Sequence, residues 1–176
     1  MGVMRSEHSI ANSLLVRADA AAVWREITQV DLASFRPPFY LGVMGIPRPL
    51  RAEIVRPGVG GARIAYLSDG RRFSQEITEW EPPERYAFTF RPDPGFRVAG
   101  FLDLRDGPFR MIAGAYRVTP EEDGVRLHLA TRYELHGIRG WLAGGTVRFV
   151  LHRVQDHLLR GIKANAERCS SGPPNA

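Results

Sequence analysis

The stretch that decides the fold is residues 140–168, GWLAGGTVRFVLHRVQDHLLRGIKANAER. Its large aliphatic residues recur every three or four positions, so they fall on one stripe of an α-helix. The stripe consists of Val147, Leu151, Val154, Leu158 and Ile162. A helix of this length extends about 43 Å at about 1.5 Å per residue. It cannot bury its stripe against itself, so it must lie across a wide apolar surface.

Short alternating segments before this helix predict that surface. Strands are expected at residues 9–18, 50–56, 62–68, 72–80, 85–91, 110–119 and 125–135. Asp69-Gly70 and residues 120–124, PEEDG, indicate hairpin turns, because glycine accepts positive φ. In the last strand, the row that holds Leu127, Leu129 and Tyr133 is mostly apolar and the other row is mostly polar. This alternation is typical of a sheet with one packed face and one solvated face.

The N-terminal part of the chain predicts a short helix and an apolar loop. Asp19 is placed to cap a helix over residues 20–27, where its carboxylate can accept from free amides of the first turn. Residues 35–46 are apolar, and the prolines in and just after them exclude a long helix. We expect either a stiff apolar flap at the mouth of a ligand site or a loop folded onto the core.

Composition limits the class of protein. A chain of 176 residues suits one domain with a sizeable core. The net charge of +5 is compatible with nucleic-acid binding. The basic residues are interleaved with acids, however, so we expect no nucleic-acid partner. The single Cys169 excludes an internal disulfide and indicates a reducing cytoplasm. The apolar runs are too short to span a membrane, and the N-terminus lacks the apolar core of a secretory signal.

The domain organisation follows from the same pass along the chain. We expect a flexible N-terminus at residues 1–8, one domain at residues 9–168 and a disordered tail at residues 169–176. No internal repeat and no composition shift divides the central region. A homodimer is left open.

Three local sequences resemble the START-related ligand-binding superfamily, also called SRPBCC, which includes polyketide cyclase/dehydratase-like proteins. They are LLVRADAAAVWREIT at residues 14–28, GVGGARIAYLSDGRRFSQEITEWEPPERYAFTF at residues 58–90 and HLLRGIKANAE at residues 157–167. The resemblance covers about residues 10–168. Asp19 stands where the superfamily often has a proline.

The resemblance implies an α+β helix-grip fold. In that fold a curved antiparallel sheet of about six or seven strands wraps around the C-terminal helix, and two short helices follow the first strand. The superfamily includes lipid carriers and polyketide aromatases and cyclases, so the fold does not choose among these functions.

The candidate polar groups of the site are two tyrosines, an arginine and a histidine. Arg63 lies where the superfamily often carries an inward polar residue, and it would anchor a carboxylate, phenolate or carbonyl; a solvated outward arginine is the alternative. Tyr116 and Tyr133 are candidate anchors, or core residues whose hydroxyls find a partner. His136 is a candidate general base, or a surface histidine at a turn.

The predicted ligand-binding residues combine these anchors with apolar walls. They are Phe39, Tyr40, Met44, Arg63, Phe88, Tyr116, Tyr133, Val147, Leu151 and Val154. No histidine pair has metal-ligand spacing, and no nucleophile or nucleotide motif is present, so no metal and no cofactor is expected.

The leading hypothesis is binding or transport of a lipid or another hydrophobic or aromatic small molecule between sheet and helix. The second is an aromatase/cyclase-type enzyme that uses Arg63, Tyr133 and His136. The third is an interaction module that binds RNA or a protein through its basic surface.

Overall fold

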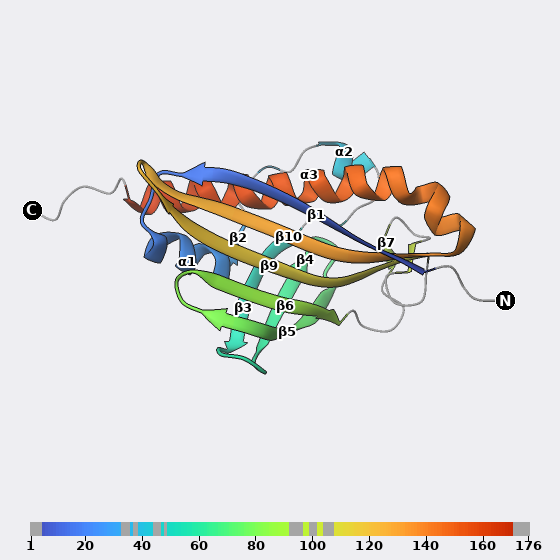
Figure 1. Ribbon diagram of the computed structural model, residues 1–176, viewed down its shortest axis with the longest axis horizontal. Coiled ribbons are helices and arrows are strands. Elements are labelled where there is room, and N and C mark those ends of the chain that lie inside the picture. The colour runs from blue at the N-terminus through green and yellow to red at the C-terminus, as the bar shows by residue number, and fades with distance from the viewer. Residues whose placement is uncertain are drawn as a thin grey trace, which may run out of the picture.

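The computed structural model describes residues 5–32, 36, 39–43, 47, 49–91, 97–98, 102–103 and 108–170. The elements are β1 (Arg5–Val16), α1 (Ala20–Thr28), β2 (Val30–Asp31), α2 (Phe39–Val43), β3 (Pro49–Arg56), β4 (Ala62–Leu67), β5 (Arg72–Glu81), β6 (Arg85–Arg91), β7 (Arg97–Val98), β8 (Leu102–Asp103), β9 (Phe109–Glu121), β10 (Gly124–His136) and α3 (Gly137–Ser170). Figure 1 shows α3 lying along the curved sheet, with α1 near its C-terminal end. The helix-grip fold is confirmed.

The main sheet contains eight antiparallel strands in the order β1-β10-β9-β6-β5-β4-β3-β2. This is one strand more than the expected maximum. The additional strand is β2, whose two residues pair with β3 and are too few to show a sequence period. The first and last strands are neighbours, paired from Arg5 with His136 to Val16 with Val125. Strands β7 and β8 form a separate small sheet.

The chain ends of the domain extend beyond the expected limits. β1 begins at Arg5, so residues 5–8, expected to be flexible, belong to the sheet. Their backbone pairs with β10, and the His8 ring stacks on Tyr133 with 5.4 Å between ring centroids. α3 ends at Ser170 and not at residue 168, so Cys169 is helical and not part of a tail.

Helix α1 begins where its capping residue indicates. The Asp19 carboxylate accepts a hydrogen bond from the Ala22 amide at 2.6 Å, as an N-cap does. Val23 and Ile27 are fully buried beneath it. Trp24 contacts Trp80 edge to face, with 5.0 Å between ring centroids. The helix therefore closes one end of the interior with an aromatic contact.

The buried stripe of α3 differs in part from the expected one. It runs through Val147, Leu151, Gln155, Leu159, Ile162 and Ala166. Val154 and Leu158 are half-buried. From Leu151 the stripe advances by four residues to Gln155 and by four more to Leu159. Val154 lies about 100° away from Gln155 around the helix. The expectation was wrong here because it followed the apolar residues and passed over a buried polar one.

Two apolar clusters form the core, and a polar pair separates them. The smaller cluster consists of Ile10, Phe109, Tyr133, Leu135, Val147 and Leu151. The larger one includes Leu129 on β10 and Leu159 on α3. Gln155 and Thr131 lie between the clusters along α3 and β10, and the Gln155 Nε2 donates to the Thr131 hydroxyl at 2.8 Å. This bond fixes the position of α3 along the sheet.

Strand β1 holds α3 along much of its length. The Asn12 side chain donates to the His152 carbonyl and contacts the His152 ring, both at 3.0 Å. Lys163 Nζ donates to the Leu15 carbonyl at 2.8 Å. Within the described ranges, no helix is long and apolar enough to cross a membrane.

Candidate functional site

The candidate site is built on the inner row of β4. Burial alternates along this strand, so Arg63, Ala65 and Leu67 face the interior while Ala62, Ile64 and Tyr66 are half-exposed. Arg63 is only 4% exposed. It therefore takes the inward of the two orientations considered from the sequence.

The guanidinium of Arg63 lies among acceptors and aromatic rings. Its Nη1 donates to the Gln75 Oε1 at 3.0 Å, and its Nη2 donates to the Ile27 carbonyl at 3.4 Å. Its Cζ lies 5.1 Å from the Phe88 ring centroid and 5.6 Å from that of Tyr86, within the range of cation–π attraction. The buried Nε has no hydrogen-bond partner among the residues described.

Within the part of the chain that the structure describes, Arg63 has no carboxylate partner. None of the ion pairs between described residues involves it. Buried charges in proteins are normally paired, because removing an ion from water costs several kcal/mol. A buried guanidinium with a free N–H and no counter-ion is chemically suited to an anion or a carbonyl oxygen.

Two tyrosines stand beside this cation in their neutral form. The rings of Tyr86 and Tyr116 are parallel, with centroids 6.1 Å apart. Burial raises the pKa of Tyr86 to about 12, although the charge of Arg63 acts in the opposite direction. Burial likewise raises the pKa of Tyr116 against the effect of Arg63. Both phenols are therefore hydrogen-bond donors at physiological pH.

The phenol of Tyr86 should make the protein sensitive to alkali. Its proton is lost near pH 10 in the unfolded chain and near pH 12 in the folded one. The neutral Tyr86 phenol therefore adds its full contribution to the free energy of unfolding below pH 10, and this contribution is lost as the pH rises to 12. The loss amounts to about 3 kcal/mol at about 1.4 kcal/mol per pKa unit.

We expect Tyr86→Phe to remove this part of the alkaline destabilisation, which urea unfolding across that pH range would measure. At neutral pH the variant should be no less stable than the wild type, because the Tyr86 hydroxyl has no hydrogen-bond partner in the described structure. Parallel loss of stability in both proteins would show that the Tyr86 phenol does not resist ionisation.

Three of the predicted residues meet at this point. Phe88 and Tyr116 are both 3% exposed and pack together, and Arg63 lies over the Phe88 ring. Gly114 makes room for Phe88, since a Cβ there would lie 2.7 Å from the ring. Gln75 and Tyr86 complete the group and were not predicted. Tyr86 shares the apolar row of Phe88 in the sequence, which indicates core packing but no polar role.

Other predicted residues lie in the smaller core cluster. Tyr133 is 2% exposed and contacts Phe109 with 5.6 Å between ring centroids. Val147 and Leu151 belong to the same cluster, and Val154 is half-buried. The Gln155–Thr131 pair separates this cluster from the one that contains Tyr116, so Tyr133 is not brought together with Arg63.

His136 lies on the other side of the sheet. Its Nε2 is 3.0 Å from the Glu134 Oε2, and both residues alternate with the buried Tyr133 and Leu135. The set expected for an enzyme, Arg63 with Tyr133 and His136, is therefore not assembled.

The expected apolar flap falls partly outside the described residues. Phe39 lies in α2 and is exposed. Tyr40 belongs to the same helix, but its side chain is outside the description, as is Met44 entirely. These two predictions therefore rest on the sequence alone.

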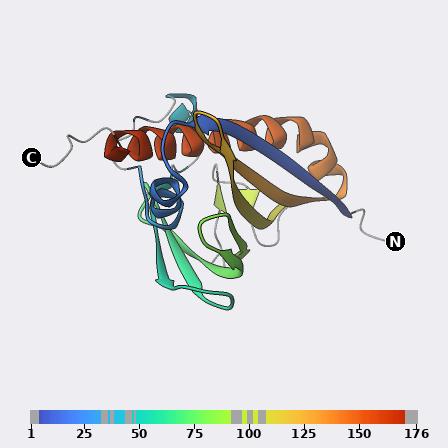
Figure 2. The same ribbon diagram turned by 60° about the vertical axis from the view of Figure 1, so that its left-hand side comes forward.

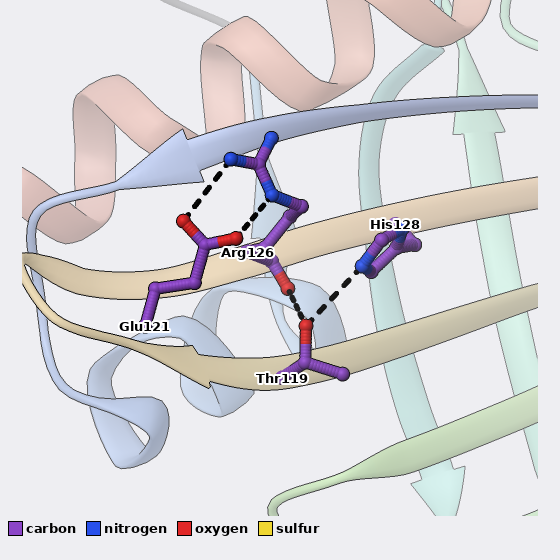
Figure 3. A network of polar contacts seen from close by, with 4 residues as sticks. All are labelled: Thr119, Glu121, Arg126 and His128. Atoms are coloured by element: carbon purple, nitrogen blue, oxygen red, sulfur yellow. Dashed lines mark hydrogen bonds and ion pairs between the residues drawn. The ribbon is translucent and has the colours of Figure 1, made fainter.

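The solvated face of the sheet carries a concavity. A pocket of about 470 Å³ is lined by Glu79, Arg85, Ala115, Tyr116, Arg117, Thr119, His128 and Ala130. At its edge the Thr119 hydroxyl lies 3.2 Å from the His128 Nε2 and donates to the Arg126 carbonyl, and Arg126 pairs with Glu121 (Figure 3). Burial and the charges of Arg126 and Arg117 lower the pKa of His128. The lining of this pocket includes one tyrosine, Tyr116, whereas Tyr86, Phe88 and Tyr116 all lie around Arg63.

No group of three or more His, Cys, Asp or Glu side chains that could hold a metal ion occurs in the part of the chain that the structure describes. Arg63, Gln75 and the two tyrosines are donors and neutral groups, which suit an organic ligand better than a cation.

Solved structures of low sequence identity share this fold. The di-domain ARO/CYC StfQ from the steffimycin biosynthetic pathway aligns with a TM-score of 0.61 and 17% identity, over 93% of this chain and 51% of that one. A truncated norcoclaurine synthase from Thalictrum flavum aligns with a TM-score of 0.56 and 16% identity over 99% of both chains. Ara h 8.0201 gives a TM-score of 0.57 and 12% identity, over 92% of this chain and 98% of that one. These likenesses show the fold alone.

Sequence comparison identifies the family. No curated protein is similar enough in sequence to match. The family described as "Polyketide cyclase / dehydrase and lipid transport" matches residues 7–167, from early in β1 to near the end of α3. Because the match spans the sheet and the helix that it encloses, the resemblance seen in the sequence is confirmed, and the chain belongs to the polyketide cyclase/dehydrase and lipid transport family.

Proposed function

We propose that the protein binds a hydrophobic or aromatic small molecule between the inner face of the sheet and α3, and that Arg63 holds its anionic or carbonyl end. The observation that carries this proposal is the buried guanidinium without a carboxylate partner. A ligand oxygen would accept from the free Nε and supply the missing charge. Hydrogen bonds that involve an ionised group are about twice as strong as neutral ones.

The surroundings of Arg63 support an aromatic or apolar ligand body. Tyr86, Phe88 and Tyr116 lie beside the guanidinium, and Trp80 extends the cluster with 5.6 Å between its ring centroid and that of Tyr86. Small-molecule sites are mostly apolar with a few directed polar groups, and this cluster has that composition. Family and fold agree with hydrophobic ligand binding or polyketide cyclase-type function.

A cyclase-type enzyme is the second candidate, with Tyr116 in place of the expected Tyr133 and His136. Arg63 would polarise a carbonyl of the bound chain, and the neutral phenol of Tyr116 would donate a proton to the developing oxyanion. Arg63 lies 5.1 Å from the ring centroid of Phe88, and the Tyr116 ring contacts the same Phe88 ring, which favours this candidate.

The proposed compartment is the cytoplasm. Cys169 is an exposed free thiol at the end of α3, which suits a reducing environment. A nucleic-acid partner is not proposed, because the arginines remain interleaved with acids along most of the chain.

A matched pair of fluorescent probes tests the proposal. 8-Anilinonaphthalene-1-sulfonate (ANS) is an aromatic anion, and N-phenyl-1-naphthylamine is its uncharged analogue. We expect both to bind the folded protein, to compete for one site per chain, and ANS to bind more tightly. Native mass spectrometry of the purified protein should also detect a retained small molecule.

The exposed apolar side chains of α3 require a control for this experiment. Leu142 is 70% exposed, so Leu142→Ser should leave both affinities unchanged if the probes enter the interior. Failure of both probes to bind, or loss of binding in Leu142→Ser, would contradict the proposal.

A further inference from the structure

The N-terminal half of α3 is apolar on two opposite faces. Val147 and Leu151 face the sheet and are buried. The solvent side carries four large apolar side chains that are between 53% and 72% exposed: Ile138, Trp141, Leu142 and Phe149. A helix that packs only against a sheet normally presents polar residues to water. The outer row is therefore an exposed apolar surface without a function in the fold.

These four side chains form a continuous stripe. At about 100° per residue, Leu142 and Phe149 fall within about 40° of Ile138, and Trp141 lies about 60° to one side. The stripe runs about 17 Å along the helix at about 1.5 Å per residue. In both views the N-terminal end of α3 lies at the opposite end of the molecule from α1 (Figures 1 and 2).

Arginines border the stripe on both sides. Arg139 and Arg153 lie about 60–100° to one side of Ile138, and Arg148 lies about 80° to the other. The Arg153 guanidinium carbon is 5.4 Å from the ring centroid of Phe149. Residues 137–155 contain no Asp or Glu, and the first turn of α3 has no acid. The surface is thus an apolar centre between two cationic margins.

We propose that this outer face of α3, defined by Ile138, Trp141, Leu142, Phe149, Arg139, Arg148 and Arg153, docks on the surface of a lipid bilayer that contains anionic lipids. Aromatic and aliphatic side chains enter the boundary between headgroups and acyl chains, and long arginines beside them reach the phosphates. Charge complementarity favours this partner, because the margins are cationic and the leaflet is anionic. The proposal does not depend on the identity of the interior ligand.

A second copy of the chain fits this surface poorly. A two-fold interface would place the arginines of one α3 against those of the other, and residues 137–155 offer no acid to pair with them. An acidic protein partner would match the arginines, and the experiment below separates it from a membrane.

Vesicle binding of the full chain is the direct test. We expect co-sedimentation with vesicles of phosphatidylcholine mixed with phosphatidylglycerol, and little with phosphatidylcholine alone. Arg139→Gln and Arg148→Gln should each weaken binding about fivefold. The double variant Trp141→Ser/Leu142→Ser should weaken it about tenfold or more.

Matched control variants carry the same changes elsewhere on the surface. Arg110→Gln alters an exposed arginine on β9, and Val59→Ser alters a valine that is 71% exposed between β3 and β4. Both should bind vesicles like the wild type. If the controls lose as much binding as the α3 variants, the attraction is a property of the whole charged surface and the proposal fails.

Tryptophan fluorescence gives a readout that needs no destabilising change. Lipids brominated on their acyl chains should quench the exposed Trp141, and this quenching should disappear in Trp141→Phe, while Trp24 and Trp80 remain unaffected in their aromatic contact. Absence of binding to any vesicle overturns the membrane assignment. So does a concentration-dependent dimer that Trp141→Ser abolishes.

Discussion

Replacing Arg63 with methionine is expected to weaken ANS binding by about ten- to hundredfold, while the affinity for N-phenyl-1-naphthylamine changes by less than about threefold. The two probes differ in the sulfonate, which stands in for the anionic end of the unknown ligand. Arg63 is the buried cation of the site, and among the described residues its Nε has no hydrogen-bond partner and its charge has no carboxylate partner. Methionine retains an apolar stem of similar length but cannot donate.

The same substitution should change the stability of the ligand-free protein by less than about 2 kcal/mol. Removing the buried charge ends a desolvation cost of several kcal/mol. The Gln75 Oε1 and the Ile27 carbonyl then lose their donor, which costs about 1–3 kcal/mol each. The two effects oppose each other, so urea unfolding should show little change while the affinity for ANS falls.

Arg110→Met is the matched control, because Arg110 is exposed on β9 and should affect neither measurement. Unchanged ANS affinity in Arg63→Met would show that Arg63 is not the anchor. A large loss of stability would show that Arg63 serves the fold instead of a ligand.

Replacing Gly124 with alanine is expected to lower the free energy of unfolding by about 2–5 kcal/mol. Gly124 begins β10 with φ of 141°, a conformation that other residues rarely adopt. A Cβ at this position would lie 2.2 Å from the Val16 carbonyl oxygen, at the end of the strand that pairs with β10. The hairpin would have to move away from β1, and the melting temperature should fall by about 5–15 °C.

Gly145→Ala is the matched control for this prediction. Gly145 lies inside α3, and no atom lies within 4 Å of the position of its added Cβ. Alanine should therefore raise the unfolding free energy by about 0.5–1 kcal/mol, because it loses less backbone entropy in a helix than glycine. Equal thermal shifts in both variants would rule out the close contact between Gly124 and β1.

Short-range signals explain why most of the fold could be predicted. A few neighbouring residues are enough to indicate the cap at Asp19, the turn at Asp69-Gly70 and the helical period of α3. β2 was missed because two residues show no period. Gln155 was missed because burial of a polar side chain depends on its bond to Thr131, a partner 24 positions away.

Whether Arg63 has a counter-ion depends on the pairing register of β4 and β5, which the sequence leaves open. A two-residue loop at Asp69-Gly70 would place Arg63 opposite Glu76 and give it a counter-ion. The loop is longer, so Arg63 pairs with Gln75 and Glu76 instead forms an ion pair with Arg91. A shift of one residue along β5 exchanges a carboxylate for an amide, because alternate residues face opposite sides of the sheet.

The position of Tyr133 shows a related difficulty. Alternation along β10 correctly indicates that its side chain faces α3, as it does for Leu129. The alternation of apolar and polar residues specifies the face of the sheet to which a side chain points. It does not specify which part of the covering helix that side chain contacts. Tyr133 therefore lies in the smaller cluster and Tyr116 in the larger one, although both belong to inner rows.

The pairing of β1 with β10 sets the order in which the chain can fold during translation. β1 is made before the other strands of the main sheet, yet among the described residues its neighbour there is β10, the last of these strands in the sequence. Until β10 emerges, Ile10 and Val16 have no strand beside them, and nascent chains with such exposed apolar segments are bound by chaperones. Closure of the sheet around α3 consequently waits for the synthesis of β10 and α3.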